Sequence, residues 1–257
     1  MSDAPMAGID LSDRRALVTG AAGGIGRACA LRLAAAGAHV IARDVDAGGA
    51  KEVAEEAGGE ALEADLSDLD AIDSLVAVAE VDILVNNAGL QHVSPIEGFE
   101  PSRFSLILRV MLEAPFRLLR KALPGMYRRG FGRVINISSV HGLRASPYKS
   151  AYVAAKHGLE GLSKVVALEG GPRGVTSNCI CPAYVRTPLV ENQIVDQARA
   201  HGIPERQVIE EVMLTEPAVK RLIEPEEVAE IAAYLCSDRA SFFNGSSLVM
   251  DGGWTAR

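Results

Sequence analysis

Residues 15–26 read Arg-Ala-Leu-Val-Thr-Gly-Ala-Ala-Gly-Gly-Ile-Gly. The apolar run over 15–19 predicts a buried β-strand, and the glycines after it predict a tight turn. Residues 25–36 carry Ala and Leu at helical spacing and are followed by Gly37, so a helix is expected to end there. A strand, a glycine-rich turn and a helix in this order form the first unit of a parallel α/β sheet.

The same alternation of strand and helix continues along the chain. Helices are predicted over 47–57, 68–79, 101–128 and 150–169, and the third of them is expected to be cut near Pro115 and Pro124. Because right-handed crossovers join parallel strands, we predict a single α/β domain over 1–257 with a Rossmann-type doubly wound sheet and helices on both faces. Its further strands are predicted over 38–42, 60–64, 81–85, 132–137 and 175–180, with a last strand and turn over 247–253.

Segment 187–222 breaks this rhythm. It contains Pro188, Pro204 and Pro217 among many charged residues. We interpret it as a helical lid over an active site, and an oligomer contact is the alternative interpretation.

The charge and cysteine content restrict the class of protein. The net charge of −7 disfavours nucleic acid as the main partner, because a phosphate footprint needs clustered Lys and Arg. No run of 18 apolar residues predicts a membrane span. The four cysteines are scattered and lack zinc-site spacing, so no metal is expected and reduced thiols of a cytoplasmic protein fit best.

The glycine loop and the end of the second strand predict a nucleotide site. Glycines let a diphosphate approach the backbone, and the following helix N-terminus attracts its charge. The spacing at Gly20, Gly24 and Gly26 is GxxxGxG rather than GxGxxG, and a simple tight turn is the alternative. Asp44 is placed to accept hydrogen bonds from a ribose and to repel a 2′-phosphate, which favours NAD, although Arg43 leaves NADP open. A cap of the next helix is the alternative role for Asp44.

Three side chains predict acid–base chemistry. Tyr152 and Lys156 are four residues apart, so they share one helix face, and Ser139 lies thirteen residues upstream of Tyr152. A nearby ammonium is expected to lower the pKa of the phenol from its usual value of about 10. Taken alone, the pair is equally compatible with an ordinary amphipathic helix.

These motifs, with Asn86-Asn87-Ala88-Gly89 between them, resemble those of the short-chain dehydrogenase/reductase family over about residues 10–254. The resemblance implies about seven parallel strands, a homotetramer, and Tyr152 as general acid/base assisted by Lys156 and Ser139. It implies cofactor contacts at Gly20, Gly24, Ile25, Gly26, Asp44, Asp65, Leu66, Asn87, Ala88, Gly89, Tyr152, Lys156, Pro182, Val185 and Thr187.

The chain departs from the family pattern at two positions. Met111 stands where the family often has a catalytic asparagine, and a thioether cannot replace the donor and acceptor of an amide. The relay of protons from Lys156 to solvent is therefore expected to differ. Ala183 replaces a glycine that commonly follows the proline, which is a mild backbone change.

Polar side chains around the trio predict an anionic substrate. Gln91, His141, Lys149 and Gln193 can all donate hydrogen bonds to a carboxylate, although each taken singly can also be a solvated or loop residue. The segments that carry them resemble those of the bacterial 3-hydroxybutyrate dehydrogenases within the family. That resemblance implies NAD-dependent interconversion of (R)-3-hydroxybutyrate and acetoacetate. Tyr184 and Trp254 would then form an apolar wall, with an interface anchor as the alternative for Trp254.

The sequence is also compatible with two other functions. An enzyme of the same fold could act on a 3-oxoacyl thioester or a sugar, and its preference for NADP over NAD would distinguish it. A non-catalytic protein that senses a dinucleotide is favoured only by Met111. The complete set of Ser139, Tyr152 and Lys156 argues against it, because a sensor does not need all three.

Overall fold

The computed structural model describes residues 8–74, 76–191, 194, 198 and 202–256. Within them, a seven-stranded parallel sheet has the order β3-β2-β1-β4-β5-β6-β7, as the alternation of strands and helices predicts. The strands are β1 (Arg15–Thr19), β2 (His39–Asp44), β3 (Glu60–Glu63), β4 (Ile83–Asn86), β5 (Gly132–Ile137), β6 (Val175–Pro182) and β7 (Ser247–Met250).

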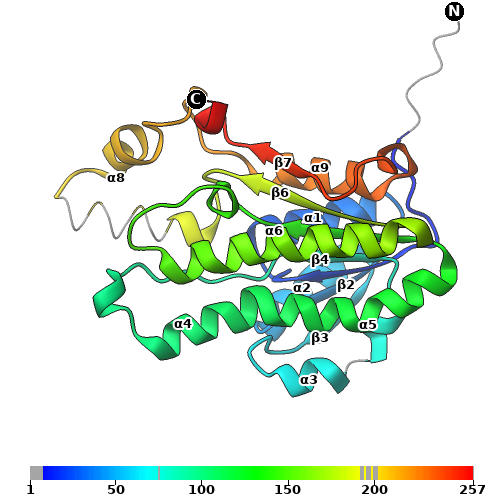
Figure 1. Cartoon of the computed structure of the whole chain (residues 1–257). Coiled ribbons are helices and arrows are strands. Elements are labelled where there is room, and N and C mark those ends of the chain that lie inside the picture. Colours follow the sequence, from blue (N-terminus) through cyan, green and yellow to red (C-terminus); the bar gives the residue numbers. More distant parts are fainter. Residues whose placement is uncertain (1–7, 75, 192–193, 195–197, 199–201, 257) are drawn as a thin grey trace, which may run out of the picture.

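Helices cover both faces of this sheet (Figure 1). One layer contains α1 (Gly24–Ala35), α2 (Ala47–Ala57) and α9 (Pro225–Cys236). The other layer contains α4 (Pro101–Leu108), α5 (Ala114–Arg129) and α6 (Ser150–Gly170). The doubly wound prediction is thus confirmed.

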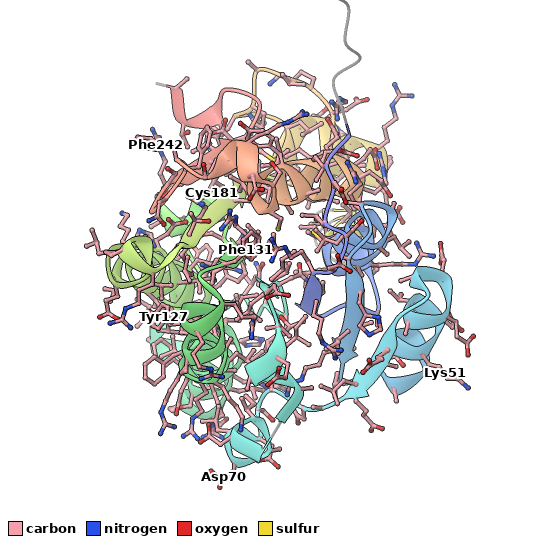
Figure 2. The ribbon with its side chains drawn as sticks, turned by 90° about the vertical axis from the view of Figure 1, so that its right-hand side faces the viewer. Lys51, Asp70, Tyr127, Phe131, Cys181 and Phe242 are labelled. Atoms are coloured by element: carbon pink, nitrogen blue, oxygen red, sulfur yellow. The ribbon has the colours of Figure 1, made fainter. Side chains whose placement is uncertain are left out.

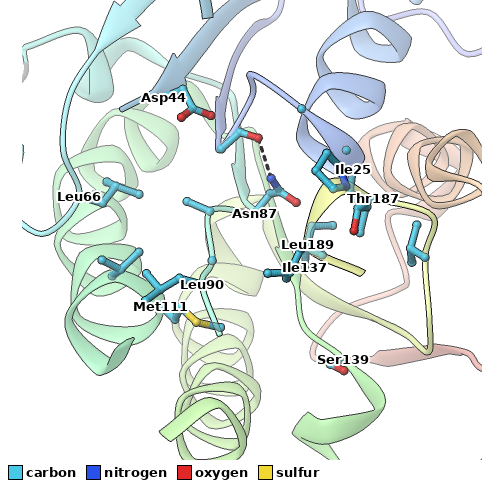
Figure 3. A pocket seen from close by; sticks show the side chains of 18 of the residues that line it. Ile25, Asp44, Leu66, Asn87, Leu90, Met111, Ile137, Ser139, Thr187 and Leu189 are labelled. Carbon is cyan, nitrogen blue, oxygen red and sulfur yellow. Dashed lines mark hydrogen bonds between the residues drawn. The ribbon is translucent and has the colours of Figure 1, made fainter. Parts of the chain in front are cut away.

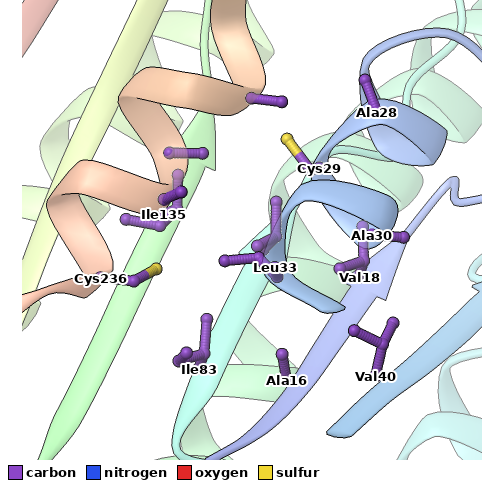
Figure 4. Packing of buried hydrophobic residues seen from close by; sticks show 14 of the residues in the cluster. Ala16, Val18, Ala28, Cys29, Ala30, Leu33, Val40, Ile83, Ile135 and Cys236 are labelled. Carbon is purple, nitrogen blue, oxygen red and sulfur yellow. The ribbon is translucent and has the colours of Figure 1, made fainter. Parts of the chain in front are cut away.

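The apolar run that opens the fold is buried on both sides. Ala16 and Val18 of β1 face the core under α1 and α9, whereas Leu17 faces the core under α5 and α6. Successive side chains of a strand point to opposite faces, so a strand covered on both faces needs an unbroken apolar run. Figure 4 shows the first core, where Cys29 of α1 and Cys236 of α9 lie between the two helices. Figure 2 shows Lys51 and Asp70 projecting outward, away from that interior.

The prediction that the long helix is cut near its prolines is wrong. Residues 101–129 are helical without interruption, through a π-helical turn at Arg109–Glu113 and past Pro124. In the wide turn, the Ala114 N–H donates to the Arg109 carbonyl five residues back, just before Pro115 removes a donor. Buried side chains such as Leu118 hold α5 against the sheet. This packing outweighs the cost of a proline in a helix, which is about 3 kcal/mol.

One other predicted helix differs from that expected. The single helix predicted over 68–79 is α3 (Leu69–Ser74) and a 3₁₀ turn at Val76–Glu80, on either side of undescribed residue 75. The last strand, β7, is confirmed next to β6.

No helix in the described ranges is long and apolar enough to cross a lipid bilayer.

The described part of segment 187–222 is helical at 188–191, in α8 (Glu205–Val208) and in a π-helical turn at Ile209–Met213. Its buried side chains form a small apolar cluster that packs against Tyr184 and Val190. That cluster consists of Ile194, Val208, Met213, Leu214 and Leu222. The helical character is confirmed, and the role as a lid remains a prediction.

Candidate active site

The carboxyl ends of the central strands line a cleft of about 500 Å³ (Figure 3). Parallel strands end at the same edge of a sheet, which is where open α/β folds bind their ligands. The cleft brings together the expected cofactor contacts Gly20, Gly24, Ile25, Asp44, Asp65, Leu66, Asn87, Ala88, Gly89, Tyr152, Lys156, Pro182, Val185 and Thr187.

Gly26, which the family resemblance also marks as a cofactor contact, does not line this cleft. A Cβ there would lie 1.9 Å from the Gly20 carbonyl oxygen and 2.5 Å from Nδ2 of Asn87. Gly26 therefore allows α1 to pack directly on the loop. Gly20, at φ +65, occupies the left-handed region that glycine alone adopts readily.

The glycine loop fits a dinucleotide diphosphate. Helix α1 begins at Gly24, and no side chain caps its N-terminus at Gly23. A Cβ at Gly23 would meet no atom within 4 Å, so the backbone is open to the cleft at this point. Uncapped N–H groups at a helix N-terminus bind phosphate, so this loop would hold the diphosphate of a nicotinamide dinucleotide.

Asp44 ends β2 at the edge of the cleft and does not cap α2. Its carboxylate accepts hydrogen bonds from the N–H groups of Ala22 at 2.9 Å and Asp46 at 3.0 Å. The cap of α2 is Asp46, which accepts from the Gly49 N–H at 3.1 Å. Asp44 is therefore held with its carboxylate beside the glycine loop, where a ribose is expected.

Arg43 is buried rather than turned toward solvent. Its side chain is fully buried, and burial lowers the pKa of the guanidinium to about 10, against the opposing charge of Asp65. The Asp65 carboxylate accepts from the Ser67 N–H and hydroxyl, each at 2.7 Å, and these bonds lower its pKa. Arg43 and Asp44 both line the cleft, Arg43 with a buried guanidinium and Asp44 with its carboxylate bonded to the glycine loop.

The Asn-Asn-Ala-Gly segment builds the wall of the cleft. Nδ2 of Asn87 donates to the carbonyls of Thr19 at 2.9 Å and Gly20 at 3.0 Å. The Thr19 hydroxyl accepts from the N–H groups of Asn87 and Ala88. These bonds tie the end of β4 to the glycine loop, as Figure 3 shows around Asn87.

The three predicted catalytic side chains meet at the inner end of the cleft. Lys156 Nζ donates to the Ile137 carbonyl at 2.6 Å and lies 5.6 Å from the centre of the Tyr152 ring. Ser139 Oγ accepts from the His141 N–H at 3.2 Å and lies 3.5 Å from the Pro182 carbonyl oxygen. Ser139 and Lys156 are buried, so a reacting group here would be shielded from water.

The expected lowering of the tyrosine pKa is not found in this state of the protein. Burial raises the pKa of Tyr152, and a hydrogen bond with Ser139 opposes the rise. Burial also lowers the pKa of Lys156 to about 8, and the neighbouring Cys179, Cys181 and Glu160 oppose this change. For both groups, removal from water is the largest effect on the pKa.

The expected substrate contacts gather in an adjoining pocket of about 60 Å³. Gln193 lies outside the described residues. Among the described expected contacts, every one lines this pocket: Gln91, Ser139, His141, Lys149, Tyr152, Tyr184 and Trp254. Their convergence disfavours the alternative that each is an unrelated surface or loop residue.

His141 and Lys149 give this pocket its polarity. His141 Nε2 lies 2.7 Å from the Ser146 hydroxyl, and burial, then Lys149 and His157, lower its pKa to about 4. The ring is therefore neutral at pH 7 and has one donor and one acceptor nitrogen. Burial also lowers the pKa of Lys149, whose Nζ lies 5.9 Å from the centre of the Tyr184 ring.

Tyr184 and Trp254 form the apolar wall. Their rings are stacked with centroids 6.1 Å apart and planes at 12°. The edge of the His141 ring meets Trp254 at 6.0 Å. Trp254 thus lines the pocket of its own chain, and its alternative role as an interface anchor remains a prediction.

Several apolar residues line the cleft that sequence reasoning did not select. They are Leu90, Val110, Ile137, Leu189 and Val190, and they lie beside Met111, which stands at the position of the family's asparagine. Met111 lies in the π-helical turn, with Cε 3.5 Å from the position a Cβ on Gly89 would take. In a sequence, apolar residues of a cleft cannot be distinguished from core residues. Only their position at the end of a strand or beside a proline could have marked them as residues of the cleft.

Comparisons with known proteins agree with this geometry. A family profile described as enoyl-(acyl carrier protein) reductase matches residues 20–255. The D-beta-hydroxybutyrate dehydrogenase of Rhizobium meliloti (strain 1021) is 48% identical over 95% of this chain and 99% of its own length. The chain belongs to the short-chain dehydrogenase/reductase family. As a short-chain dehydrogenase/reductase, it is an oxidoreductase that uses a nicotinamide dinucleotide and acts on a small molecule.

Two further members of this family are similar over nearly the whole chain. The D-beta-hydroxybutyrate dehydrogenase of Cupriavidus necator is 43% identical over 96% of this chain and its full length. A crystal structure described as a putative NAD(P)-dependent gluconate 5-dehydrogenase from Beutenbergia cavernae, with bound NADP, has a TM-score of 0.86 and 36% identity. It covers 97% of this chain and 99% of its own.

Proposed function

We propose that this protein interconverts (R)-3-hydroxybutyrate and acetoacetate with NAD. One observation carries the proposal: a half-buried cation, Lys149, shares a 60 Å³ pocket with Gln91, His141 and the pair Ser139 and Tyr152. A small pocket that holds a cation and amide or imidazole donors beside an acid–base pair suits a short hydroxy acid. The identity with the two D-beta-hydroxybutyrate dehydrogenases supports the same substrate.

The polar residues Gln91, Ser139, His141, Lys149 and Tyr152 each have a role in this mechanism. Lys149, with Gln91 and His141, binds the carboxylate. The substrate hydroxyl lies between Ser139 and Tyr152, and the tyrosinate accepts its proton while the Ser139 hydroxyl stabilises the oxygen. When bound, the nicotinamide supplies the carbon that accepts the hydride from carbon 3. Acetoacetate reduction uses the same groups in reverse.

The experiment that tests this function supplies NAD and pure (R)-3-hydroxybutyrate to the purified protein. We expect the near-ultraviolet absorbance of reduced nicotinamide to rise, more slowly or not at all with the (S) enantiomer. Acetoacetate with reduced cofactor should give the reverse change. Good turnover of gluconate, an oxoacyl thioester or an uncharged alcohol, without any signal from either enantiomer, would refute the proposed substrate.

The preference for NAD rests on Asp44, and Asp44→Asn tests it. The substitution keeps an acceptor for the Ala22 N–H but removes the charge that would repel a 2′-phosphate. The ratio of kcat/KM with NAD to that with NADP is expected to fall by about tenfold or more. Repulsion of the 2′-phosphate by a nearby unit charge has an energy of this size.

Asp46→Asn is the matched control for Asp44→Asn, since it removes a carboxylate two residues away and retains an acceptor for the Gly49 N–H. It should leave the cofactor ratio within about twofold of wild type. A wild-type protein that already prefers NADP, or an unchanged ratio in Asp44→Asn, would contradict the assignment.

The expected homotetramer and the lid remain proposals. Large apolar side chains are exposed on a single chain at Phe116 of α5, Leu168 of α6 and Phe242, which is fully exposed (Figure 2). Exposed apolar side chains of this kind support contact with further copies of the chain. The apolar cluster that packs on Tyr184 and Val190 supports a lid at the substrate pocket.

A further inference from the structure

A carboxylate is buried behind the catalytic lysine. Glu160 follows Lys156 by four residues on α6, and Tyr152 precedes it by eight, so the three share one face of the helix. Glu160 is only 4% exposed, as is Lys156. Glutamate is rarely buried so completely unless it is paired, and the proposed mechanism gives this one no role.

The Glu160 carboxylate is fixed from three sides. Oε1 accepts from the Cys181 thiol of β6 at 3.1 Å, and Oε2 accepts from the Ser247 hydroxyl of β7 at 2.6 Å. On the third side lies Gly142, where a Cβ would come within 3.1 Å of Cγ of Glu160. The site therefore holds the carboxylate in one position beside α6.

Glu160 supplies the negative charge near Lys156. The Lys156 ammonium is surrounded by the Tyr152 ring, the Ile137 carbonyl of β5 and two thiols of β6, Cys179 and Cys181. Burial raises the pKa of both thiols far above neutrality, so they are uncharged at pH 7. Against the effect of burial, the pKa of Lys156 is raised by Cys179, Cys181 and Glu160, in that order, and Glu160 is the one of the three that is not a thiol kept neutral by burial.

We propose that Glu160 is a positioning residue of the active site, whose fixed carboxylate keeps Lys156 charged beside Tyr152 although the lysine is buried. The inference rests on the proposed function for the role of Lys156 in turnover. Without this charge, Lys156 would lose its proton at lower pH, and the tyrosinate would lose the cation that stabilises it. The interactions that set the charge of Lys156 thus begin at Ser247 of β7, which bonds to Glu160, and end at the lysine beside the Tyr152 phenol.

The pH profile of kcat tests this role in Glu160→Gln. Gln keeps an acceptor for the Cys181 thiol and a partner for Ser247 but carries no charge. The alkaline limb of the profile, where Lys156 loses its proton, is expected to move about one pH unit toward acid. The ionisation of Tyr152 should shift less than that of Lys156, because Tyr152 lies about 12 Å from Glu160 along the helix.

Ser247→Ala is the matched control, since it removes one hydrogen bond from Glu160 and leaves the carboxylate. It should keep the alkaline limb within about 0.3 pH unit of wild type. Glu160→Met, which is neutral and apolar, gives the same expected shift as Glu160→Gln and replaces it should that variant not fold. An unmoved alkaline limb in a folded neutral variant, or an equal shift in Ser247→Ala, would overturn the proposal.

Thermal melting of the cofactor-free full chain gives a readout that needs no substrate. Lys156 is charged in the folded protein below its folded pKa of about 8 and uncharged above it. The attraction between Glu160 and Lys156 is therefore present at pH 7 and lost at pH 9.5. We expect the melting temperature of Glu160→Gln to fall below that of wild type at pH 7 and by clearly less at pH 9.5.

An equal difference in melting temperature at the two pH values would overturn the role of Glu160. This outcome is distinguishable from failure of the proposed function. If the wild type does not turn over 3-hydroxybutyrate, the substrate assignment fails, while the melting experiment still decides whether Glu160 controls the charge of Lys156.

Discussion

Tyr152→Phe is expected to lower kcat for 3-hydroxybutyrate oxidation by a factor of about 10² to 10⁴, the usual contribution of a positioned acid or base. Phe removes the oxygen that accepts the substrate proton and hydrogen-bonds with Ser139. It keeps the ring that meets the His141 ring edge-on at 6.1 Å, so the pocket should retain its shape. Steady-state kinetics over pH 6 to 9 would measure the loss as a fall in kcat rather than a rise in KM.

Tyr148→Phe is the matched control for this variant. Tyr148 is four residues upstream and 58% exposed, and it loses the same hydroxyl without touching the pocket. Its kcat should stay within about twofold of wild type. Tyr152→Phe should still bind reduced cofactor, as nicotinamide fluorescence would report. If Tyr152→Phe keeps a kcat close to wild type, another group must take the proton and the acid–base assignment is wrong.

Lys149→Ala should lower kcat/KM for 3-hydroxybutyrate by about 1.5–3 kcal/mol, or roughly 10- to 150-fold, the range for a hydrogen bond to a charged group. Lys149 lines the pocket together with Gln91 and His141, so the carboxylate would lose its cation and keep two neutral donors. Because the carboxylate is bound both before and during hydride transfer, we expect most of the loss to appear as a rise in KM. Initial rates with NAD at saturating concentration give both constants.

Two comparisons separate a loss of charge from a loss of packing. Lys149→Met keeps most of the side-chain stem over the Tyr184 ring and should be impaired nearly as much as Lys149→Ala. Lys164→Ala makes the same change at an exposed position of α6 and should behave as wild type. An unchanged kcat/KM in Lys149→Ala would show that this ammonium does not bind the substrate, which would remove the main support for a hydroxy acid.

The order of strands and helices could be predicted from the chain because it depends on local patterns. A strand covered on both faces needs consecutive apolar side chains, such as Ala16, Leu17 and Val18 of β1, and a helix on a sheet must show its own period. The two prolines misled the prediction because their cost is local, whereas the compensation comes from a π-helical turn and from buried residues such as Leu118. The pattern of neighbouring residues in a sequence does not show which side chains will be buried by elements far away in that sequence.

The sequence by itself determined which chemical groups the site contains. Spacing along one helix put Tyr152 and Lys156 on the same face, and the ends of parallel strands had to bring Ser139 beside them. Only the tertiary structure decided the charge environment of these groups. Burial raises the pKa of Tyr152 and lowers that of Lys156, and it places Glu160 behind the lysine although a glutamate on a helix usually faces water. Desolvation depends on what every neighbouring element covers, and that is settled only when the whole chain has folded.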